Sequence, residues 1–215
     1  MRASLITLCL SLGLLAAGPA RAEGERAGDF DYYILSLGWS PSWCALEGDA
    51  RGDRQCDPGR GFGFTLHGLW PQYEEGWPSY CRSGIREATR AETAAMADIM
   101  GSAGLAWHEW KKHGRCSGLA AGEYFALSRE AYRAVAIPAV LRDLARDVRL
   151  PASVVEDAFI EANPGLAPGM ITVTCEGERI DEVRICLDPD LGFRACAPDA
   201  AHDCRLKDAL MDRVR

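Results

Sequence analysis

The strongest constraint on this 215-residue chain is a set of cysteines that follows a segment typical of a secretory signal. The segment begins Met1-Arg2, continues with an apolar run over residues 5–17 and ends in Ala20-Arg21-Ala22, an A-x-A cleavage pattern. Its apolar run is too short for a permanent membrane span. We therefore expect cleavage after Ala22 and a mature chain of residues 23–215 without membrane anchoring. We expect export to the periplasm or to the extracellular medium.

The chain has nine cysteines, and eight remain once Cys9 leaves with the signal. An even number in an exported chain predicts disulfides, with 105 possible connectivities for eight cysteines. Structural zinc is the competing interpretation, but no Cys-x-x-Cys pair occurs. Spacing favours Cys44–Cys56 early in the chain and Cys175–Cys204 around Cys186–Cys196 at its end, which leaves Cys81–Cys116.

The charge of the mature chain argues against a non-specific nucleic-acid binder. Removing Arg2 and Arg21 from the 24 basic residues leaves 22, against 31 acidic residues, a formal charge of −9. Proteins that bind nucleic acid non-specifically usually present a basic surface. If this protein binds RNA, it must do so at a local site.

Hydrophobic periodicity predicts an α+β fold in one domain. Strands are expected at residues 30–37, 62–67, 170–175, 178–187 and 192–196, and helices at 85–100, 123–137, 138–148 and 153–162, the last capped by Ser153. Another helix should begin at Ser102 or Gly104 and end at Gly114. A segment rich in Gly, Asp and Arg at 47–61 and a Gly- and Pro-rich segment at 68–81 are expected to be loops. Strands at both ends, with helices between them, predict a central antiparallel sheet with several packed helices, stapled by disulfides.

A charged cluster lies in the expected helix before Gly114. With His108 at zero and about 100° per residue, Glu109 lies near 100°, Lys112 near 40° and His113 near 140°, all on one broad face. The spacing differs from the zinc motif H-E-x-x-H, because the second histidine is at i+5 and Lys112 occupies i+4. The cluster is more typical of acid–base chemistry than of a metal site, and we expect no metal and no cofactor.

Other catalytic arrangements are less favoured. Cys116 is near His113, but exported cysteines are better explained as disulfide partners, and no Gly-x-Ser-x-Gly elbow occurs. His67, at the end of an apolar strand, could by itself be a core residue. Together with the helix cluster it supplies a second imidazole, so that one histidine can act as base and another as acid. A neighbouring lysine can neutralise a phosphate oxygen. This set suits attack of a ribose 2′-hydroxyl on the adjacent phosphorus.

Two aromatic residues, Trp70 and Tyr73, follow His67 in the expected loop. They could pin the loop to the core. They could equally stack on RNA bases, each stacked base contributing about 1–3 kcal/mol, which needs no basic exterior.

Two segments resemble the active-site segments of the ribonuclease T2 family. These are Phe64-Thr65-Leu66-His67-Gly68-Leu69-Trp70-Pro71 and Trp107-His108-Glu109-Trp110-Lys111-Lys112-His113-Gly114-Arg115-Cys116. Residues 32–44 are similar to the first strand and turn of the family, and residues 170–175 and 183–186 to its terminal strands.

The resemblance implies a ribonuclease T2-like fold and a metal-independent endoribonuclease. Single-stranded RNA would be cleaved by transesterification to a 2′,3′-cyclic phosphate and then hydrolysed to a 3′-phosphate. By the same resemblance, His113 is the base and His67 the acid of the first step, and His108 binds the phosphate. Glu109 and Lys112 would stabilise the transition state. Trp70, Gln72 and Tyr73 are the candidate substrate-binding residues, and we expect a monomer.

Two departures from the family pattern concern base recognition. Gly38 stands where many eukaryotic members have Gln, and Gln72 where many members have an acidic residue, so we expect weak base preference. The rival hypothesis is a binding module that has kept the fold without catalysis. Such a module would be free to lose a catalytic residue, and none of the five is missing here.

Overall fold

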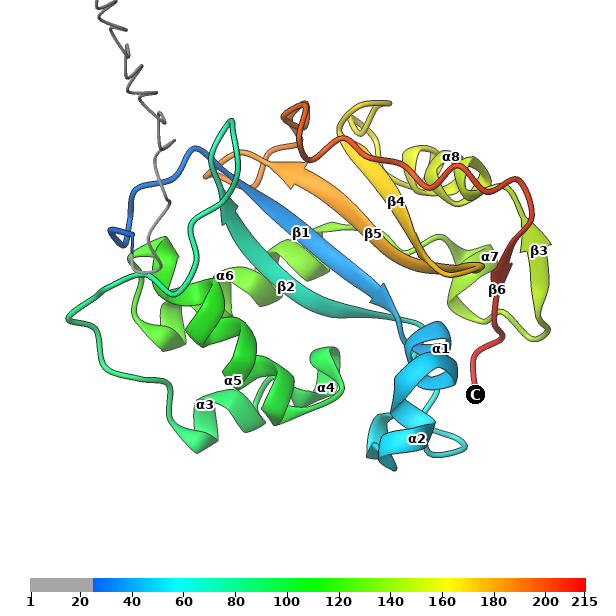
Figure 1. Ribbon diagram of the computed structural model, residues 1–215, viewed down its shortest axis with the longest axis horizontal. Coiled ribbons are helices and arrows are strands. Elements are labelled where there is room, and N and C mark those ends of the chain that lie inside the picture. The colour runs from blue at the N-terminus through cyan, green and yellow to red at the C-terminus, as the bar shows by residue number, and fades with distance from the viewer. Residues whose placement is uncertain (1–24) are drawn as a thin grey trace, which may run out of the picture.

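A six-stranded sheet forms the centre of the fold (Figure 1). The computed structural model describes residues 25–215, so the expected signal segment at residues 1–22 lies outside the described residues. The strand order is β2–β1–β5–β6–β3, and β4 also pairs with β5. The named strands pair antiparallel except for β5 with β6. The strands are β1 (Tyr32–Trp39), β2 (Phe64–Gln72), β3 (Val148–Leu150), β4 (Ile171–Glu176), β5 (Arg179–Leu187) and β6 (Ala209–Met211).

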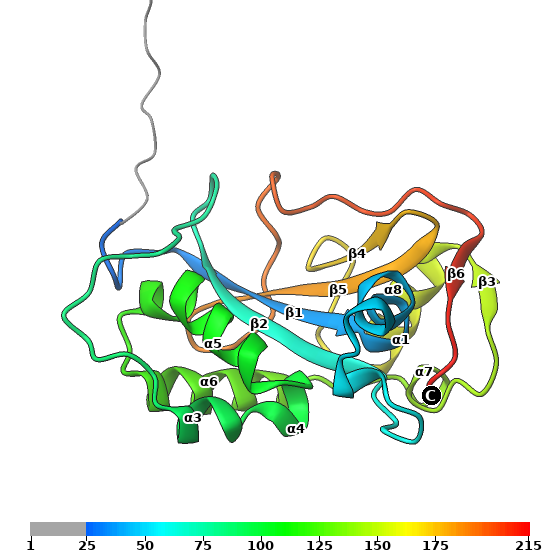
Figure 2. The same cartoon turned by 60° about the horizontal axis from the view of Figure 1, so that its bottom comes forward.

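The helices lie around this sheet in groups. Helices α3 to α6 gather beside β2, and α1 and α2 lie beyond the end of β1, as both views show (Figures 1 and 2). Helix α8 packs against β4. The expected α+β class is confirmed. The helices are α1 (Ser40–Trp43), α2 (Asp49–Arg51), α3 (Arg90–Ala94), α4 (Ala97–Met100), α5 (Ala103–Lys112), α6 (Ala121–Ala134), α7 (Ala139–Arg142) and α8 (Ala152–Ala162).

Strand β1 is buried on both faces, and its two faces serve different parts of the molecule. Its odd-numbered residues, such as Leu35 and Leu37, join the main core with Trp110 of α5 and Phe159 of α8. Its even-numbered residues Tyr32 and Ile34 join a smaller cluster. Alternate strand residues point to opposite faces. The helices therefore pack against the face that bears Leu35 and Leu37, and the face that bears Tyr32 and Ile34 packs against the smaller cluster.

Within residues 25–215, four disulfides staple the fold, and several of their cysteines are buried. They close loops of 12, 35, 29 and 10 residues. The bridge after β2 ties the loop that follows this strand to the turn after α5, close to the histidine cluster. The pairs are Cys44–Cys56, Cys81–Cys116, Cys175–Cys204 and Cys186–Cys196, the pairing that spacing favoured.

The first two strands end later in the chain than the sequence predicted. β1 continues through Gly38 to Trp39, and β2 continues through Pro71 to Gln72, where we expected a loop. Pro71 lies opposite Tyr33 on an edge strand, where a residue without an N–H is tolerated because one side of the strand needs no donor. Trp70 therefore lies in a strand and not in a loop.

Several helix predictions were also wrong in detail. The helix expected at 85–100 is two helices, and α3 begins only after Thr89, whose side chain forms a capping box with Glu92. Helix α8 begins after Pro151, so Ser153 lies inside it and is not its cap. The segment 138–148 is helical only over α7.

Two peripheral segments differ as well. Residues 40–56, which overlap the loop expected at 47–61, form short helical turns with Pro41 in the first turn of α1, a position that suits proline. The strand expected at 192–196 is only a bridge between Leu187 and Phe193. Strand β6, only three residues long, was missed because so short a run carries no periodicity.

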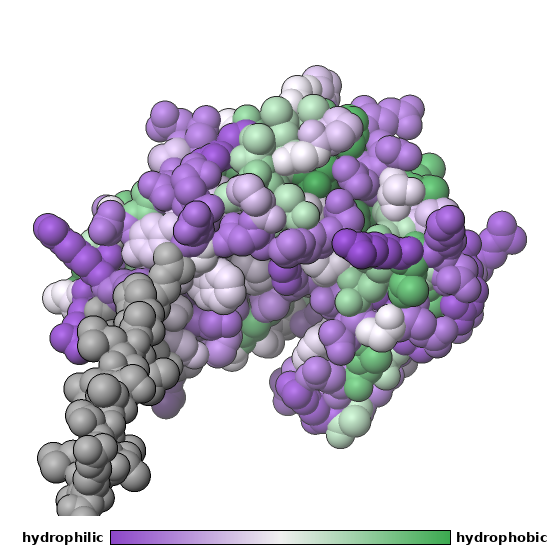
Figure 3. Space-filling model, turned by 45° about the horizontal axis from the view of Figure 1, so that its top comes forward, coloured by the Kyte–Doolittle hydropathy of each residue, from purple (hydrophilic) through white to green (hydrophobic). Residues whose placement is uncertain are grey.

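None of the helices within residues 25–215 has the length and apolarity needed to cross a bilayer. Hydrophilic residues cover most of the face drawn in Figure 3, with hydrophobic residues in small patches between them.

Candidate active site

A bulge in β2 determines where His67 points. Ser36 pairs with Gly68 and Leu37 pairs with Leu66, so His67 is an extra residue with no partner in β1. In a regular strand His67 and Trp70, three residues apart, would point to opposite faces. The extra residue places the side chains of His67 and Trp70 on the same face, and the centroids of their rings lie 5.2 Å apart.

Helix α5 brings the second group of side chains to the edge of β2. Its first turn is capped by Ser102, whose hydroxyl accepts a 3.1 Å hydrogen bond from the N–H of Leu105. Trp110 fixes the buried face of the helix in the core. Glu109 is almost completely buried and faces β2, while His113 forms the C-terminal cap and His108 is exposed.

Glu109 connects the helix to the strand. Its Oε2 accepts a 2.6 Å hydrogen bond from Nε1 of Trp70, and its Oε1 lies 3.6 Å from Nε2 of His67. Burial raises the pKa of Glu109, against the opposing pull of His67, Trp70 and Lys112. Gly68 makes this contact possible, because a Cβ at that position would lie 2.2 Å from Oε2 of Glu109.

His67 is also bound on its other nitrogen, by a residue that sequence reasoning missed. Its Nδ1 donates a hydrogen bond to Oε1 of Glu182 in β5. Burial by itself would lower the pKa of His67, but this bond and the nearby carboxylates of Glu182, Glu109 and Asp181 outweigh it, so the pKa is raised. The pKa of Glu182 falls to about 2 in spite of its burial, because His67 and Arg184 bind it.

His113 has the opposite electrostatic environment. Its ring stacks on Trp70 with 5.2 Å between centroids and 29° between planes. Burial, and then the neighbouring Lys112, His67 and His108, lower its pKa to about 3. Its Nδ1 is buried without a hydrogen-bond partner among the described residues. At neutral pH His113 is therefore uncharged.

The two remaining members of the cluster flank these histidines. Burial, then Lys112 and His67, lower the pKa of His108. Lys112 is half-buried, and its backbone carbonyl accepts a 2.9 Å hydrogen bond from the N–H of Tyr80. That contact holds the loop after β2 against the end of α5.

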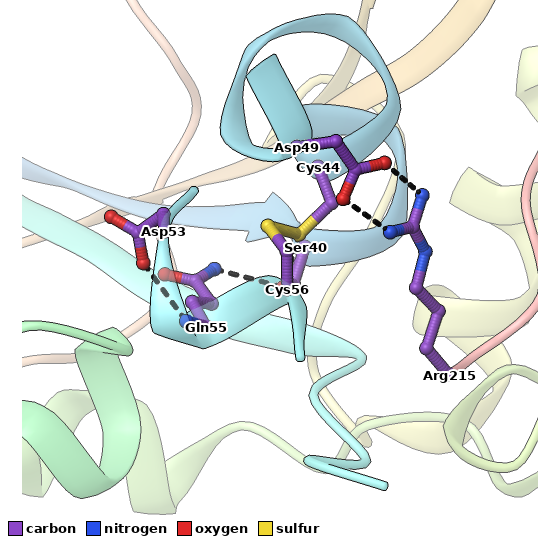
Figure 4. Close-up of a disulfide and its surroundings, with 7 residues drawn as sticks. All are labelled: Ser40, Cys44, Asp49, Asp53, Gln55, Cys56 and Arg215. Carbon is purple, nitrogen blue, oxygen red and sulfur yellow. Dashed lines mark hydrogen bonds and ion pairs between the residues drawn. A yellow bond between two sulfur atoms is a disulfide. The ribbon is translucent and has the colours of Figure 1, made fainter. Parts of the chain in front are cut away.

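The larger of two cavities beside the cluster measures about 430 Å³ and opens next to His67 and His108. Its far wall comes from the segment stapled by Cys44–Cys56, which Figure 4 shows in close-up. There Nε2 of Gln55 donates a 2.8 Å hydrogen bond to Oγ of Ser40. Gly38, Asp181 and Glu182 line the same cavity, and no side chain projects from the glycine.

The second cavity, about 150 Å³, lies beside Lys112 and His113. Trp70 and Gln72 line it, as does Trp77, which is 55% exposed, whereas Tyr73 is not among its lining residues. The carboxamide of Gln72 is buried, and its Nε2 donates to the carbonyl of Pro71 at 2.8 Å.

The five predicted catalytic residues therefore meet at one place, between two cavities. Within residues 25–215 no group of three or more His, Cys, Asp or Glu side chains is arranged to hold a metal ion. Sequence reasoning missed Glu182 and Arg184, which lie in β5, far along the chain. The sequence signal was an acidic pair, Asp181-Glu182, between the apolar residues Ile180 and Val183 of a predicted strand.

Comparison with known proteins gives consistent results. A sequence model of the ribonuclease T2 family matches residues 30–196. A ribonuclease of Aeromonas hydrophila is 40% identical over 131 residues, which cover 60% of this chain and 57% of the relative. The chain spans about half the length of the curated relatives it matches.

Solved structures share the fold. The RNase-related protein from Calystegia sepium matches with a TM-score of 0.63 at 21% identity, over 86% of this chain and 98% of that one. RNase NT, solved in complex with 5′-AMP, matches with a TM-score of 0.60 at 22% identity, over 84% and 97%. The family match spans most of the described residues and includes both histidine-bearing segments, so the chain belongs to the ribonuclease T2 family.

Proposed function

We propose that the protein is an endoribonuclease that cleaves single-stranded RNA by metal-independent transesterification. The products would be 2′,3′-cyclic phosphate ends, which are then hydrolysed to 3′-phosphates. The observation that carries the proposal is the pair of histidines that both contact Trp70. Each ring lies 5.2 Å from the indole, yet carboxylates bind His67, whereas His113 is buried and has cationic neighbours. One fold thus favours the charged form of one imidazole and the neutral form of the other.

His113 is the base of the first step. Its neutral form persists at all but strongly acidic pH, so it can accept the proton of the ribose 2′-hydroxyl. A pKa of about 3 describes the protein alone; a bound phosphate anion favours the charged imidazole and raises the pKa toward the value that suits a base.

His67 is the acid of the first step. Because Nδ1 of His67 is hydrogen-bonded to Glu182, the proton on Nε2 is the one that passes to the leaving 5′-oxygen. In the second step the roles reverse: neutral His67 takes a proton from water, and protonated His113 returns one to the 2′-oxygen.

The transition-state charge needs further support from α5. Lys112 and His108 lie beside the two histidines, where an ammonium and an imidazole can bind phosphate oxygens. Charge on the equatorial oxygens increases in the pentacoordinate state, so positioned cations stabilise it more than the ground state. Glu109, buried and bound to Trp70, is placed to support His67 and the same centre.

The two cavities suggest how RNA is bound. They lie on either side of the catalytic groups, as the bases that flank one phosphate do. Trp70 already contacts His113 and the Arg184 guanidinium, whereas Trp77 is the most exposed aromatic in the smaller cavity. We propose that Trp77 supplements Trp70 as a stacking surface, with Gln72 and Tyr73 supporting the strand end. We also propose weak base preference.

The wider setting of the enzyme follows from the same reasoning. We propose that residues 1–22 direct export to the periplasm or the medium, and that residues 23–215 act as a single-domain monomer. Four disulfides are the kind of support that oxidising compartments allow.

The rival function is a binding module with the same fold. The protein from Calystegia sepium that shares this fold is described only as RNase-related, so fold alone does not decide for catalysis. The opposed environments of His67 and His113 favour catalysis, because a binding site needs no such asymmetry.

The deciding experiment is incubation of the purified protein with single-stranded RNA in excess EDTA, followed by analysis of the new ends. We expect 2′,3′-cyclic phosphates first and 3′-phosphates later. RNA that is bound but not cut would favour the binding module. Cleavage that stops in EDTA and returns with zinc would contradict the metal-independent mechanism.

A further inference from the structure

Glu182 reaches His67 across an intervening strand. In the register of the sheet, Glu182 of β5 pairs with Gly38 of β1, and Gly38 pairs with Thr65 of β2. Thr65 and His67 share a face, so the imidazole and the carboxylate approach each other over Gly38. A Cβ added to Gly38 would have no atom within 4 Å, so the backbone there leaves this space open.

The carboxylate of Glu182 is held from its other side. Nε of Arg184 donates to Oε2 at 2.8 Å, and a terminal guanidinium nitrogen of Arg184 lies 2.6 Å from the same oxygen. The backbone N–H of Glu182 donates to Oγ1 of Thr174 at 3.2 Å. Glu182 itself is only 5% exposed. One oxygen therefore faces the arginine and the other faces the histidine, with little freedom to exchange.

We propose that Glu182, oriented by Arg184, is a positioning residue that keeps the proton on Nδ1 of His67 and directs Nε2 toward the reacting phosphate. This inference rests on the proposed ribonuclease activity. Glu182 need not touch the RNA, because it acts only through the imidazole.

The proton balance requires this tautomer in both steps. In the first step His67 begins with protons on both nitrogens and gives the Nε2 proton to the 5′-oxygen. The neutral ring then keeps its remaining proton on Nδ1, hydrogen-bonded to Glu182, so the lone pair of Nε2 faces the cyclic phosphate. In the second step that lone pair takes a proton from the attacking water, and His67 is charged again.

Other charged groups also face His67, and a pH experiment has to include them. Glu182 is the only one that hydrogen-bonds the ring nitrogen of His67 among the described residues. The groups are Asp181, Glu182 and Arg184 from β5, Glu109, His108, Lys112 and His113 from α5 and its cap, and Arg51 and Asp53 across the larger cavity.

Glu182→Gln gives a sharp test. Arg184 can only donate, so it will bind the amide oxygen of the glutamine and leave the NH₂ group facing Nδ1. The amide then donates to Nδ1 and fixes the wrong neutral tautomer. In serine proteases the corresponding exchange lowers kcat about 10⁴-fold. We expect kcat to fall at least ~100-fold with little change in KM, and the alkaline limb of the pH profile to move to lower pH.

The conservative variant and a matched control complete the series. Glu182→Asp keeps the acceptor but retracts it by one methylene, so we expect it to recover part of the lost kcat. Glu178→Gln removes a carboxylate that pairs with Arg149 on the surface next to the same strand, and should leave kcat and the pH profile unchanged. An unchanged kcat and pH profile in a folded Glu182→Gln variant would overturn the proposal.

A spectroscopic measurement on the unmodified protein does not depend on the variants folding. In ¹⁵N NMR spectra of neutral His67, assigned with His67→Ala, we expect the Nδ1–H tautomer. The Nε2–H tautomer would overturn the inference. Failure of the unmodified protein to produce cyclic phosphate ends would instead contradict the proposed function, so the two failures are distinguishable.

Discussion

The indole Nε1 of Trp70 and the carboxylate Oε2 of Glu109 share a 2.6 Å hydrogen bond that joins β2 to α5. Both partners belong to segments that carry a proposed catalytic histidine, so this bond helps to set the distance between the two halves of the site. It also fixes the plane of the indole on which His113 stacks. Trp70 is thus part of the framework that holds the proposed catalytic residues, as well as a candidate surface for a base.

Gly68→Ala should break this junction. The new Cβ would lie 2.2 Å from both Oε2 of Glu109 and Nε1 of Trp70, so the two side chains must separate. We expect kcat to fall at least ~100-fold, as for loss of positioned acid–base groups, while the protein stays folded. Gly84→Ala is the matched control, because a Cβ there meets nothing within 4 Å. Normal activity of a folded Gly68→Ala protein would show that the junction is not needed.

His113→Ala should abolish most of the activity without unfolding the protein. A positioned base contributes about 10²–10⁴-fold, so we expect a loss of at least ~100-fold in initial rate on RNA. His202→Ala removes an exposed histidine outside the site and should leave the rate unchanged. Circular dichroism would verify the fold of both variants. A folded His113→Ala protein with near-normal activity would refute the assignment of the base.

The sequence was sufficient to predict the α+β class, the disulfide pairs and the residues that meet in the cluster. Residue type and local spacing determine these features: helix α5 follows from its cap and period, and the disulfide pairs follow from the spacing of the cysteines. The strand at residues 62–67 was predicted up to His67, but its continuation through Pro71 was not. Edge position tolerates that proline, and edge position is a property of the assembled sheet.

The contact of His67 with Glu182 could not be predicted for a similar reason. The two residues are 115 positions apart, and their meeting depends on the register of three strands and on the bulge at His67. A shift of one residue in either register would turn one side chain to the opposite face. Nothing local in the sequence specifies that register.

The pH dependence of cleavage should reflect two opposed histidines. The first step needs neutral His113, whose pKa is about 3, and protonated His67, whose pKa lies above its ordinary 6.5. Activity should therefore rise as pH passes the lower pKa and fall as pH passes the upper one, which gives an optimum on the acidic side. Measuring kcat/KM on a dinucleoside phosphate would check this. A rate that still increases at about pH 9 would contradict it.

The two bridges near the site should differ in their contribution to stability. Cys81–Cys116 closes a loop of 35 residues and Cys44–Cys56 one of 12. From the entropy of the unfolded chain we expect replacement by paired alanines to lower the free energy of unfolding by about 4 and about 3 kcal/mol, respectively. Urea unfolding would measure both. The reverse order would indicate that contacts in the folded state dominate.

Weak base preference is expected from what the two cavities lack. Gly38 presents no side chain to the larger cavity, and the amide of Gln72 beside the smaller one is already bonded to the backbone. A directional contact to a base edge discriminates by about 1–3 kcal/mol, whereas stacking accepts every base. We therefore expect initial rates on the sixteen dinucleoside phosphates to lie within about a hundredfold of one another, the range that a single such contact would give. Gly38→Gln should widen that spread by placing an amide in the larger cavity. A spread well beyond a hundredfold in the unmodified protein would contradict weak preference.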